Sequence, residues 1–350
     1  MTMQTLREIQ TIQGAILEDS TAIPLSFGND AEALAATQNG VAICDRTHWG
    51  LLKFSDEDKL RFLHNQSTND IQSLQPGQGC DTVFVNSTAR TLDLSTLYVT
   101  EDAVLVVVSP NRRQMLLEWL DRYIFPMDRV QLKDISEEYA IFSLLGSQSN
   151  LFLEKLGITA VIDQPYATHQ PVEIENIPIR IAVGSGLVTP GYTLIVSIDH
   201  AASLWEKLIE LGAIAMGNLV WEQLRIAQGR PVPDLELTED YNPLEAGLWQ
   251  TISFEKGCYI GQETIARLNT YKGVKQRLWG LKLNAPVAVG ETIQVEDQKV
   301  GKLTSIAKTE AGWFGLGYIR TKAGGQGLTV KVAEVDAEVV EVPFLTHPVE

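Results

Sequence analysis

Two kinds of hydrophobic periodicity alternate along the first two-thirds of the chain. Short runs rich in β-branched and aromatic residues predict strands, and apolar residues at three- and four-residue spacing predict helices. The predicted strands cover residues 49–54, 92–99, 103–108, 139–144, 177–183 and 193–198, and the predicted helices lie at 60–63, 115–120, 150–156, 200–211 and 218–229. This order, after a polar N-terminal arm, favours two α+β lobes with antiparallel sheets over a doubly wound parallel sheet.

Capping residues mark the ends of several predicted helices. Ser55 and Asp58 form a candidate capping box for the helix at 60–63. Ser109 and Pro110 supply a cap and a first-turn proline for the helix at 115–120. The helix at 218–229 is expected to stop at its terminal glycine.

The pattern changes near residue 276. Beyond it, short apolar runs at 277–283, 292–295, 299–306, 314–319 and 329–335 are separated by glycine or proline turns, without a convincing helical period. Closely spaced short strands of this kind are typical of a small β-barrel. We therefore expect two α+β lobes within residues 1–215, a connecting segment at 216–275 and a C-terminal barrel at 276–350.

Composition places the chain among soluble globular proteins. It has 350 residues, of which 45% are hydrophobic, and it lacks an apolar run of the ~18–20 residues that a membrane span needs. Residues 1–8 have neither a signal-peptide core nor a transit-peptide character, so a cytoplasmic location and no membrane partner are expected. The formal net charge of −16 argues against wrapping duplex nucleic acid by charge alone.

Local charge and potential metal ligands refine this picture. Between positions 256 and 277 the only acid is Glu263, and the five cations there form a basic island: Lys256, Arg267, Lys272, Lys275 and Arg277. This island could attract an anionic small molecule or a short RNA, or it could be a solvated face. The three cysteines, Cys44, Cys80 and Cys258, form no C-x-x-C pair, and the five histidines show no paired-ligand spacing. No self-contained metal site is expected.

Cys258 is the best candidate for chemistry. It lies between Gly257 and Gly261, just before a plausible helix at 264–268. Unpaired N–H groups and the dipole at a helix N-terminus favour a thiolate, and Lys256 would add a positive charge nearby. We therefore expect a partly exposed thiol with a pKa below that of a free cysteine.

The peptide around Cys258 resembles the K-G-C-Y-x-G-Q-E signature of the YgfZ family of folate-binding proteins. All fixed positions match: Lys256, Gly257, Cys258, Tyr259, Gly261, Gln262 and Glu263. Segments 44–50, 67–71, 224–229 and 243–247 are similar in order and spacing to the wider superfamily, which includes the aminomethyltransferase (T-protein) of glycine cleavage. The resemblance runs from about Val41 into the barrel, and it implies a GcvT-like ring of three subdomains around a pocket for tetrahydrofolate or a derivative.

The resemblance also implies folate-binding residues. Two tryptophans associated with folate in YgfZ proteins match Trp49 and Trp221, and indole faces can stack on a flat pterin. We expect them on opposite walls of one cavity. Arg225 could bind the glutamate tail by a bidentate bond, and Asn69 and Asp70 belong to the same expected site. The alternative is that the tryptophans are core residues and that Arg225 is a surface partner of Glu222.

Departures from the transferase pattern bear on mechanism. The acidic residue that reads the pterin in G-Y-T-G-E is absent, because Gly191-Tyr192-Thr193 is followed by Leu194, and the paired aspartates of the transferase are reduced to Asp93. Glycine-cleavage activity is therefore not expected.

The resemblance implies an accessory factor for the synthesis or repair of iron–sulfur clusters, which acts on cluster-assembly or client proteins, including enzymes that modify tRNA. Cys258 would be its working thiol, as a ligand or a nucleophile. The alternatives are a tetrahydrofolate-dependent methyl or aminomethyl transferase, with Asp93 or Asp70 as the acid–base group, and direct tRNA contact through the basic island.

Overall fold

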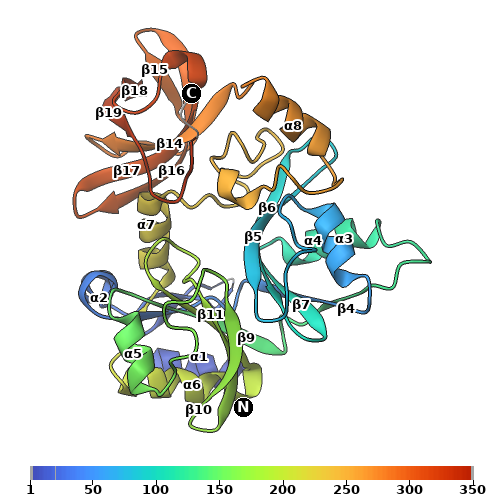
Figure 1. Cartoon of the computed structure of the whole chain (residues 1–350). Coiled ribbons are helices and arrows are strands. Elements are labelled where there is room, and N and C mark those ends of the chain that lie inside the picture. Colours follow the sequence, from blue (N-terminus) through green and yellow to red (C-terminus); the bar gives the residue numbers. More distant parts are fainter. Residues whose placement is uncertain (1–2, 20, 348–350) are drawn as a thin grey trace. The chain divides into compact units, whose positions relative to one another are not determined.

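A computed structural model describes residues 3–19 and 21–347 (Figure 1). The chain divides into two compact units. The first unit comprises Met1–Leu60, Ser73–Cys80 and Thr96–Trp221, and the second comprises Arg61–Gln72, Asp81–Ser95 and Glu222–Glu350. The division therefore passes through several regular elements, and it assigns the octapeptide at 256–263 to the second unit.

The first unit is built on a six-stranded sheet with the order β10-β11-β12-β9-β3-β13. Its neighbours pair antiparallel except β13, which runs parallel to β3. The strands are β3 (Ala42–Asp45), β9 (Tyr139–Leu145), β10 (His169–Ile174), β11 (Ile177–Val183), β12 (Gly191–Ser197) and β13 (Ile214–Met216). Helices α5 (Ser149–Lys155) and α6 (Ile198–Glu210) pack against this sheet, and the buried Trp205 of α6 contacts Phe27 and Phe142 in the core.

The N-terminal segment is more structured than the expected polar arm. It contains α1 (Met3–Ile12), the short strands β1 (Ile16–Leu17) and β2 (Pro24–Ser26), and α2 (Asp30–Asn39). Helix α1 packs on α6 and buries Leu6 and Gln10 at i, i+4 spacing. The buried carboxylate of Asp45 accepts hydrogen bonds from Arg7 and Gln10, so the arm is fixed by polar contacts as well as by apolar packing.

A second sheet has the antiparallel strand pairs β6–β7, β4–β7 and β4–β8 and the order β5-β6-β7-β4-β8. Its strands are β4 (Gly50–Ser55), β5 (Gly79–Val85), β6 (Thr91–Val99), β7 (Ala103–Val108) and β8 (Gln131–Asp134). Helices α3 (Lys59–Gln66) and α4 (Arg113–Asp121) follow β4 and β7 in the chain. Strands β5 and β6 continue from one compact unit into the other.

Both predicted N-terminal caps of these helices are wrong. The carboxylate of Asp58 accepts the backbone N–H of Arg129 rather than closing a box with Ser55. Ser109 begins a turn in which Asn111 has φ +63°, and this left-handed residue delays the start of α4 to Arg113. Tertiary partners and a turn thus override the local capping signals.

The C-terminal part of the second unit is a closed six-stranded barrel with the order β14-β17-β16-β15-β18-β19 (Figure 1). Its strands are β14 (Gln276–Leu283), β15 (Thr292–Val295), β16 (Gln298–Thr309), β17 (Gly312–Arg320), β18 (Thr329–Val332) and β19 (Val335–Val340). The run predicted as one strand at 329–335 is divided, because Ala333 takes φ +51° and turns the chain into β19. Pairing of β19 with β14 closes the barrel.

Between sheet and barrel the chain forms α7 (Asn218–Gln228), a 3₁₀ turn η1 (Trp249–Thr251) and α8 (Gln262–Thr270), and η2 (Thr321–Ala323) follows β17. A buried cluster joins β5, β6, the end of α7 and the barrel: Val83, Val85, Leu94, Ile226, Leu237, Ala246, Leu248, Leu278, Leu316, Tyr318 and Val342. The described residues contain no helix with the length and apolar character of a membrane span.

Candidate functional site

Cys258 lies in an irregular loop rather than in the first turn of a helix. Helix α8 begins at Gln262 with Gly261 as its N-cap, so the cysteine precedes the cap by three positions. Its side chain is exposed, whereas Cys80 is half-buried and Cys44 is buried, and none of the three forms a disulfide. The thiol most accessible to a reactant is therefore that of Cys258.

Lys256 anchors this loop. Its Nζ donates hydrogen bonds to the carbonyl oxygens of His64, Ser67 and Asn69 at 2.5, 2.8 and 2.6 Å, respectively. Its ammonium also lies 4.7 Å from the centre of the Tyr259 ring. Because an ammonium group has three N–H donors, the three carbonyls match its full capacity. The lysine expected to act beside the thiol thus ties the loop to α3 and the segment that follows α3.

Gly261 fixes the other end of the loop. It has φ +81°, and a Cβ at this position would lie 2.9 Å from the carbonyl oxygen of Asn86 and 3.0 Å from Cα of Ala89. Only glycine fits without displacing the turn between β5 and β6. Gly257, by contrast, has open space around its Cα. The two signature glycines therefore have different structural environments.

The remaining signature residues complete the loop. Tyr259 N–H donates to Oε1 of Gln262 at 3.2 Å, and Ile260 N–H donates to the carbonyl oxygen of Asn65 at 3.0 Å. Burial raises the pKa of the Tyr259 phenol to about 12, so the phenol stays protonated at neutral pH. Glu263 is exposed in the first turn of α8, where its negative charge interacts favourably with the helix dipole.

Asn69 and Asp70 lie beside this anchor. The side-chain amide of Asn69 donates to the carbonyl oxygen of Asp81 at 2.8 Å, while Asp70 Oδ1 lies 3.1 Å from Nδ1 of His64. Burial and then the charge of Lys256 lower the pKa of His64, and Asp70 opposes this shift. His64 was not among the predicted site residues, because its position within α3 carries no motif.

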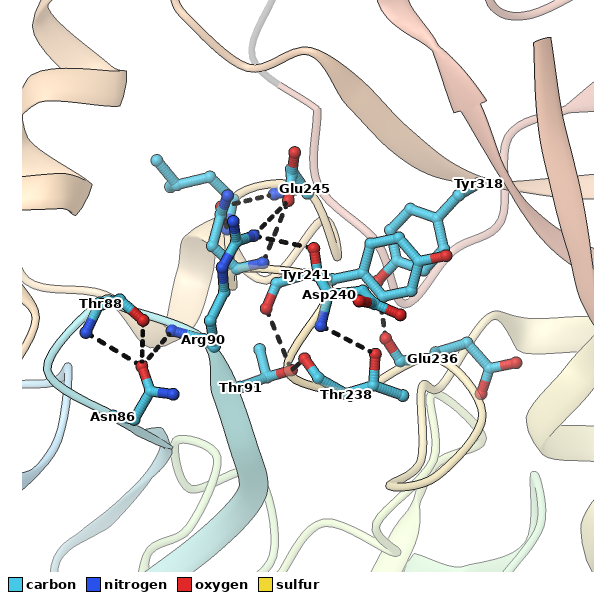
Figure 2. A network of polar contacts seen from close by, with 12 residues as sticks. Asn86, Thr88, Arg90, Thr91, Glu236, Thr238, Asp240, Tyr241, Glu245 and Tyr318 are labelled. Atoms are coloured by element: carbon cyan, nitrogen blue, oxygen red, sulfur yellow. Dashed lines mark hydrogen bonds and ion pairs between the residues drawn. The ribbon is translucent and has the colours of Figure 1, made fainter. Parts of the chain in front are cut away.

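A polar network supports the β5–β6 turn on which Gly261 packs (Figure 2). Asn86 Oδ1 accepts the backbone N–H groups of Thr88 and Arg90. The Arg90 side chain reaches the loop that precedes the octapeptide and donates to the carbonyl oxygen of Asp240 at 2.8 Å. It also lies 3.7 Å from the Glu245 carboxylate, whose pKa burial raises. The segment at 240–245 thus holds the turn in addition to its own strands.

The same network continues into the barrel. Thr91 Oγ1 donates to the carbonyl oxygen of Thr238 at 2.9 Å, and Thr91 N–H donates to that of Tyr241 at 3.0 Å. The rings of Tyr241 and Tyr318 stack with centroids 3.5 Å apart, and the Tyr318 hydroxyl donates to the carbonyl oxygen of Glu236 (Figure 2). Loop, hairpin and barrel therefore form one continuous support for the octapeptide.

The two expected folate-stacking tryptophans contact each other. The ring centroids of Trp49 and Trp221 are 6.4 Å apart in an edge-to-face arrangement, and both side chains are buried. The guanidinium carbon of Arg46 lies 4.2 and 4.9 Å from the two ring centres. The expectation of opposite cavity walls is therefore wrong, because a pterin ring does not fit between indoles in contact. Arg46 was not among the predicted site residues, and it completes the cluster.

Arg225 is a partner of Glu222, as the alternative interpretation expected, but it is buried rather than on the surface. Its Nε donates to Glu222 at 2.6 Å, Nη1 lies 3.4 Å from Oε2 of the fully buried Glu236, and Nη2 donates to Ser305 at 3.1 Å. The guanidinium is thus engaged by groups of its own unit, an arrangement that favours a structural role.

Asp93, the acid retained from the expected pair, is fully buried in β6. Its Oδ2 accepts the Ser95 hydroxyl at 2.8 Å. Among the residues that the structure describes, no cluster of three or more His, Cys, Asp and Glu side chains could hold a metal ion. Within the basic island, Lys256 donates hydrogen bonds to the carbonyl oxygens described above, whereas Arg267, Lys272 and Lys275 are exposed.

Comparisons with known proteins agree with this architecture. The GCVT N-terminal domain family matches residues 20–256. A chloroplastic protein of Arabidopsis thaliana with a provisional transferase name is 48% identical over 348 residues, which cover 98% of this chain and 80% of the relative. An aminomethyltransferase of Halothermothrix orenii is 25% identical over 337 residues, or 93% of this chain and 94% of the relative.

A solved structure shares the fold. The glycine cleavage system aminomethyltransferase T from Bartonella henselae matches with a TM-score of 0.86 at 20% identity, over 97% of both chains. This match, together with the closed barrel, confirms the α+β, GcvT-like fold expected from the sequence. The chain therefore belongs to the GCVT domain family, as a relative of the glycine-cleavage T-protein.

Proposed function

We propose that this protein is a folate-binding accessory factor for the synthesis or repair of iron–sulfur clusters, similar to the YgfZ proteins, with Cys258 as its working thiol. The geometry of the octapeptide carries the proposal. Cys258 is exposed, while Lys256 and Gly261 fix the loop on either side of it. An accessible thiol on a firmly held loop suits exchange with sulfur or iron on a partner.

The partner would complete the chemistry. Iron–sulfur clusters are commonly held by four protein ligands, so a single cysteine cannot hold one alone. Cys258 would act as a transient ligand or as a nucleophile toward a persulfide or disulfide on a cluster-assembly or client protein. Enzymes that modify tRNA are among the clients we expect, through their own clusters. The cytoplasmic location stays a prediction.

Tetrahydrofolate or a derivative is the small molecule we assign, because the chain belongs to a family that includes aminomethyltransferases. Asp70 is the best placed of the candidate contacts: its side chain is 39% exposed and lies beside the octapeptide anchor. Asn69 would act mainly by positioning, since its amide already donates to Asp81. Trp49, Trp221 and Arg225 are buried among protein partners, so their substitution would act on folate through packing.

Complementation tests the proposal. A strain that lacks its own YgfZ protein is transformed with the wild type, Cys258→Ala or Cys80→Ala. We expect the wild type and Cys80→Ala to restore growth and the activity of iron–sulfur enzymes, and Cys258→Ala to fail while accumulating to the wild-type level. Full rescue by Cys258→Ala would refute a working thiol.

A one-carbon transferase is the second candidate, and the transferase names of the relatives favour it. The acid–base group would be Asp70 rather than Asp93, because Asp93 is fully buried and accepts a hydrogen bond from Ser95. Purified protein incubated with labelled methylene-tetrahydrofolate and candidate amines distinguishes the two functions. Turnover that survives in Cys258→Ala and disappears in Asp70→Asn would favour the transferase.

Direct tRNA contact through the basic island is the third possibility to test. Binding to phosphates weakens steeply with added salt. A gel shift at two salt concentrations, with Lys272→Gln as the variant, separates this contact from an indirect effect through client enzymes.

A further inference from the structure

Two clefts in the first unit meet at Arg180, away from the octapeptide in sequence. One has a volume of about 380 Å³ and the other about 530 Å³, and both are lined by Thr100, Pro171 and Arg180. The smaller cleft adds Lys53, Asp102 and an apolar wall from β7, β11 and β12, and the larger adds the segment at 76–78. Arg180 thus lines both clefts, and we refer to the two together as the Arg180 groove.

Arg180 is held in place by a neutral group. Its Nη1 lies 2.8 Å from Nδ1 of His169, and Nε2 of the same ring lies 3.2 Å from the carbonyl oxygen of Gln78. Because guanidinium can only donate, Nδ1 accepts and Nε2 carries the ring proton. His169 is buried, and burial followed by the charge of Arg180 lowers its pKa to about 4. The imidazole is therefore neutral at pH 7 and contributes no negative charge to offset that of the arginine.

No carboxylate in the described part of the chain lies within 4 Å of the Arg180 guanidinium as an ion-pair partner. Two acids line the clefts, Asp102 and Glu101. Thr100 donates to Asp102 at 3.0 Å and Lys53 lies 3.8 Å from it, while the charge of Asp102 opposes the effect of burial on the pKa of Arg180. Arg180 is half-buried, and burial lowers its pKa. Burying a cation without a counter-ion is unfavourable. Because Arg180 lines a groove open to solvent, an anion in solution can reach it.

We propose that this groove binds a small organic anion through Arg180, with a carboxylate or phosphate as the recognised group. The donors of Arg180 that His169 does not engage offer the planar fork that suits either oxyanion. Lys53 of β4 also lines the smaller cleft and adds a second cation. Prolines and aliphatic residues along the groove would contact a short apolar body: Pro76, Pro171, Pro178, Ile179 and Ile195. The site is independent of the function proposed for Cys258.

Isothermal titration of the full-length protein with inorganic phosphate and, separately, with glutarate tests the site. We expect saturable binding of at least one probe, weakened by about tenfold or more in Arg180→Gln because a charge-assisted contact is lost. Asp102→Asn should strengthen binding several-fold, since it removes a negative charge whose side chain is 80% exposed. Lys155→Gln, which removes an exposed cation on α5 that lines neither cleft, should change the affinity by less than about twofold.

The two probes distinguish the recognised group. Tighter binding of phosphate would indicate a phosphorylated ligand, and tighter binding of glutarate a carboxylate. If neither probe shows saturable binding up to about 20 mM, the proposal is overturned, because specific small-ligand sites have dissociation constants far below this concentration. Unchanged affinity in Arg180→Gln would also overturn it. If that variant fails to fold, Arg180→Lys keeps the charge and loses the fork, and unchanged affinity there would overturn it as well.

Discussion

Lys256→Met removes the ammonium that anchors the Cys258 loop while nearly conserving the shape of the side chain. Three carbonyl oxygens lose a charged donor, those of His64, Ser67 and Asn69. A hydrogen bond to a charged group contributes about 1.5–3 kcal/mol. Because Lys256 is only half-buried, water replaces part of the loss. We therefore expect a loss of about 3 kcal/mol in the free energy of unfolding, below the sum of three such bonds.

Urea unfolding followed by far-ultraviolet circular dichroism and fluorescence measures this loss. With a slope of about 3 kcal/mol per M, the midpoint of the transition that includes the second unit should fall by about 1 M. Lys282→Met is the matched control, since Lys282 is exposed on β14 of the same unit, and its effect should stay within about 0.5 kcal/mol.

A second readout separates the anchor from general destabilisation. After burial, the charge of Lys256 is the largest influence that lowers the pKa of His64, so Lys256→Met should raise that pKa in an NMR titration. A variant with wild-type stability and an unchanged His64 pKa would refute the carbonyl anchor.

Three further outcomes follow from the structure. Gly261→Ala should lower the free energy of unfolding by about 2 kcal/mol or more, because the backbone at Gly261 is left-handed and an added Cβ would meet the Asn86 carbonyl. Gly257→Ala should change it by no more than about 0.5 kcal/mol. Equal effects of the two variants in urea melts would contradict the close packing of Gly261 on the Asn86 carbonyl. Iodoacetamide with mass spectrometry should label Cys258 before the half-buried Cys80 and the buried Cys44, and early labelling of Cys44 would be inconsistent with this fold. The pKa of His169 is about 4 in the folded protein against an ordinary 6.5, so between these pH values the unfolded chain binds one more proton and the stability falls as the pH drops. His169→Gln should remove up to about 1.4 kcal/mol per pH unit from this dependence of unfolding free energy on pH. An unchanged pH dependence would refute a buried neutral ring.

The sequence predicted much of the fold because most elements have one strongly apolar face. The predicted strands at 103–108 and 177–183 have the observed bounds of β7 and β11. Helix α1 was missed because its packed face includes the polar Gln10, whose partner Asp45 is distant in sequence. The last barrel strand was merged with β18 because a left-handed alanine gives no turn signal of its own.

The candidate site was predicted less completely. The motif located Cys258, but it could not show that Lys256 faces carbonyls from residues 64–69, because that contact depends on tertiary structure. Likewise, residue type alone did not distinguish a tryptophan stacked on a ligand from one packed on another tryptophan. The rings of Trp49 and Trp221 pack against each other and against the Arg46 guanidinium.

The central claim is that the Cys258 thiol, rather than the loop that carries it, performs the function. The most direct measurement is the activity of an iron–sulfur enzyme in extracts of a strain that lacks its own YgfZ protein, normalised to the amount of each expressed variant. Cys258→Ser keeps the shape of the exposed side chain and should leave the urea midpoint unchanged. We predict that extracts with the wild type recover the enzyme activity while those with Cys258→Ser remain at the level of the empty vector. Equal recovery by both would contradict the account.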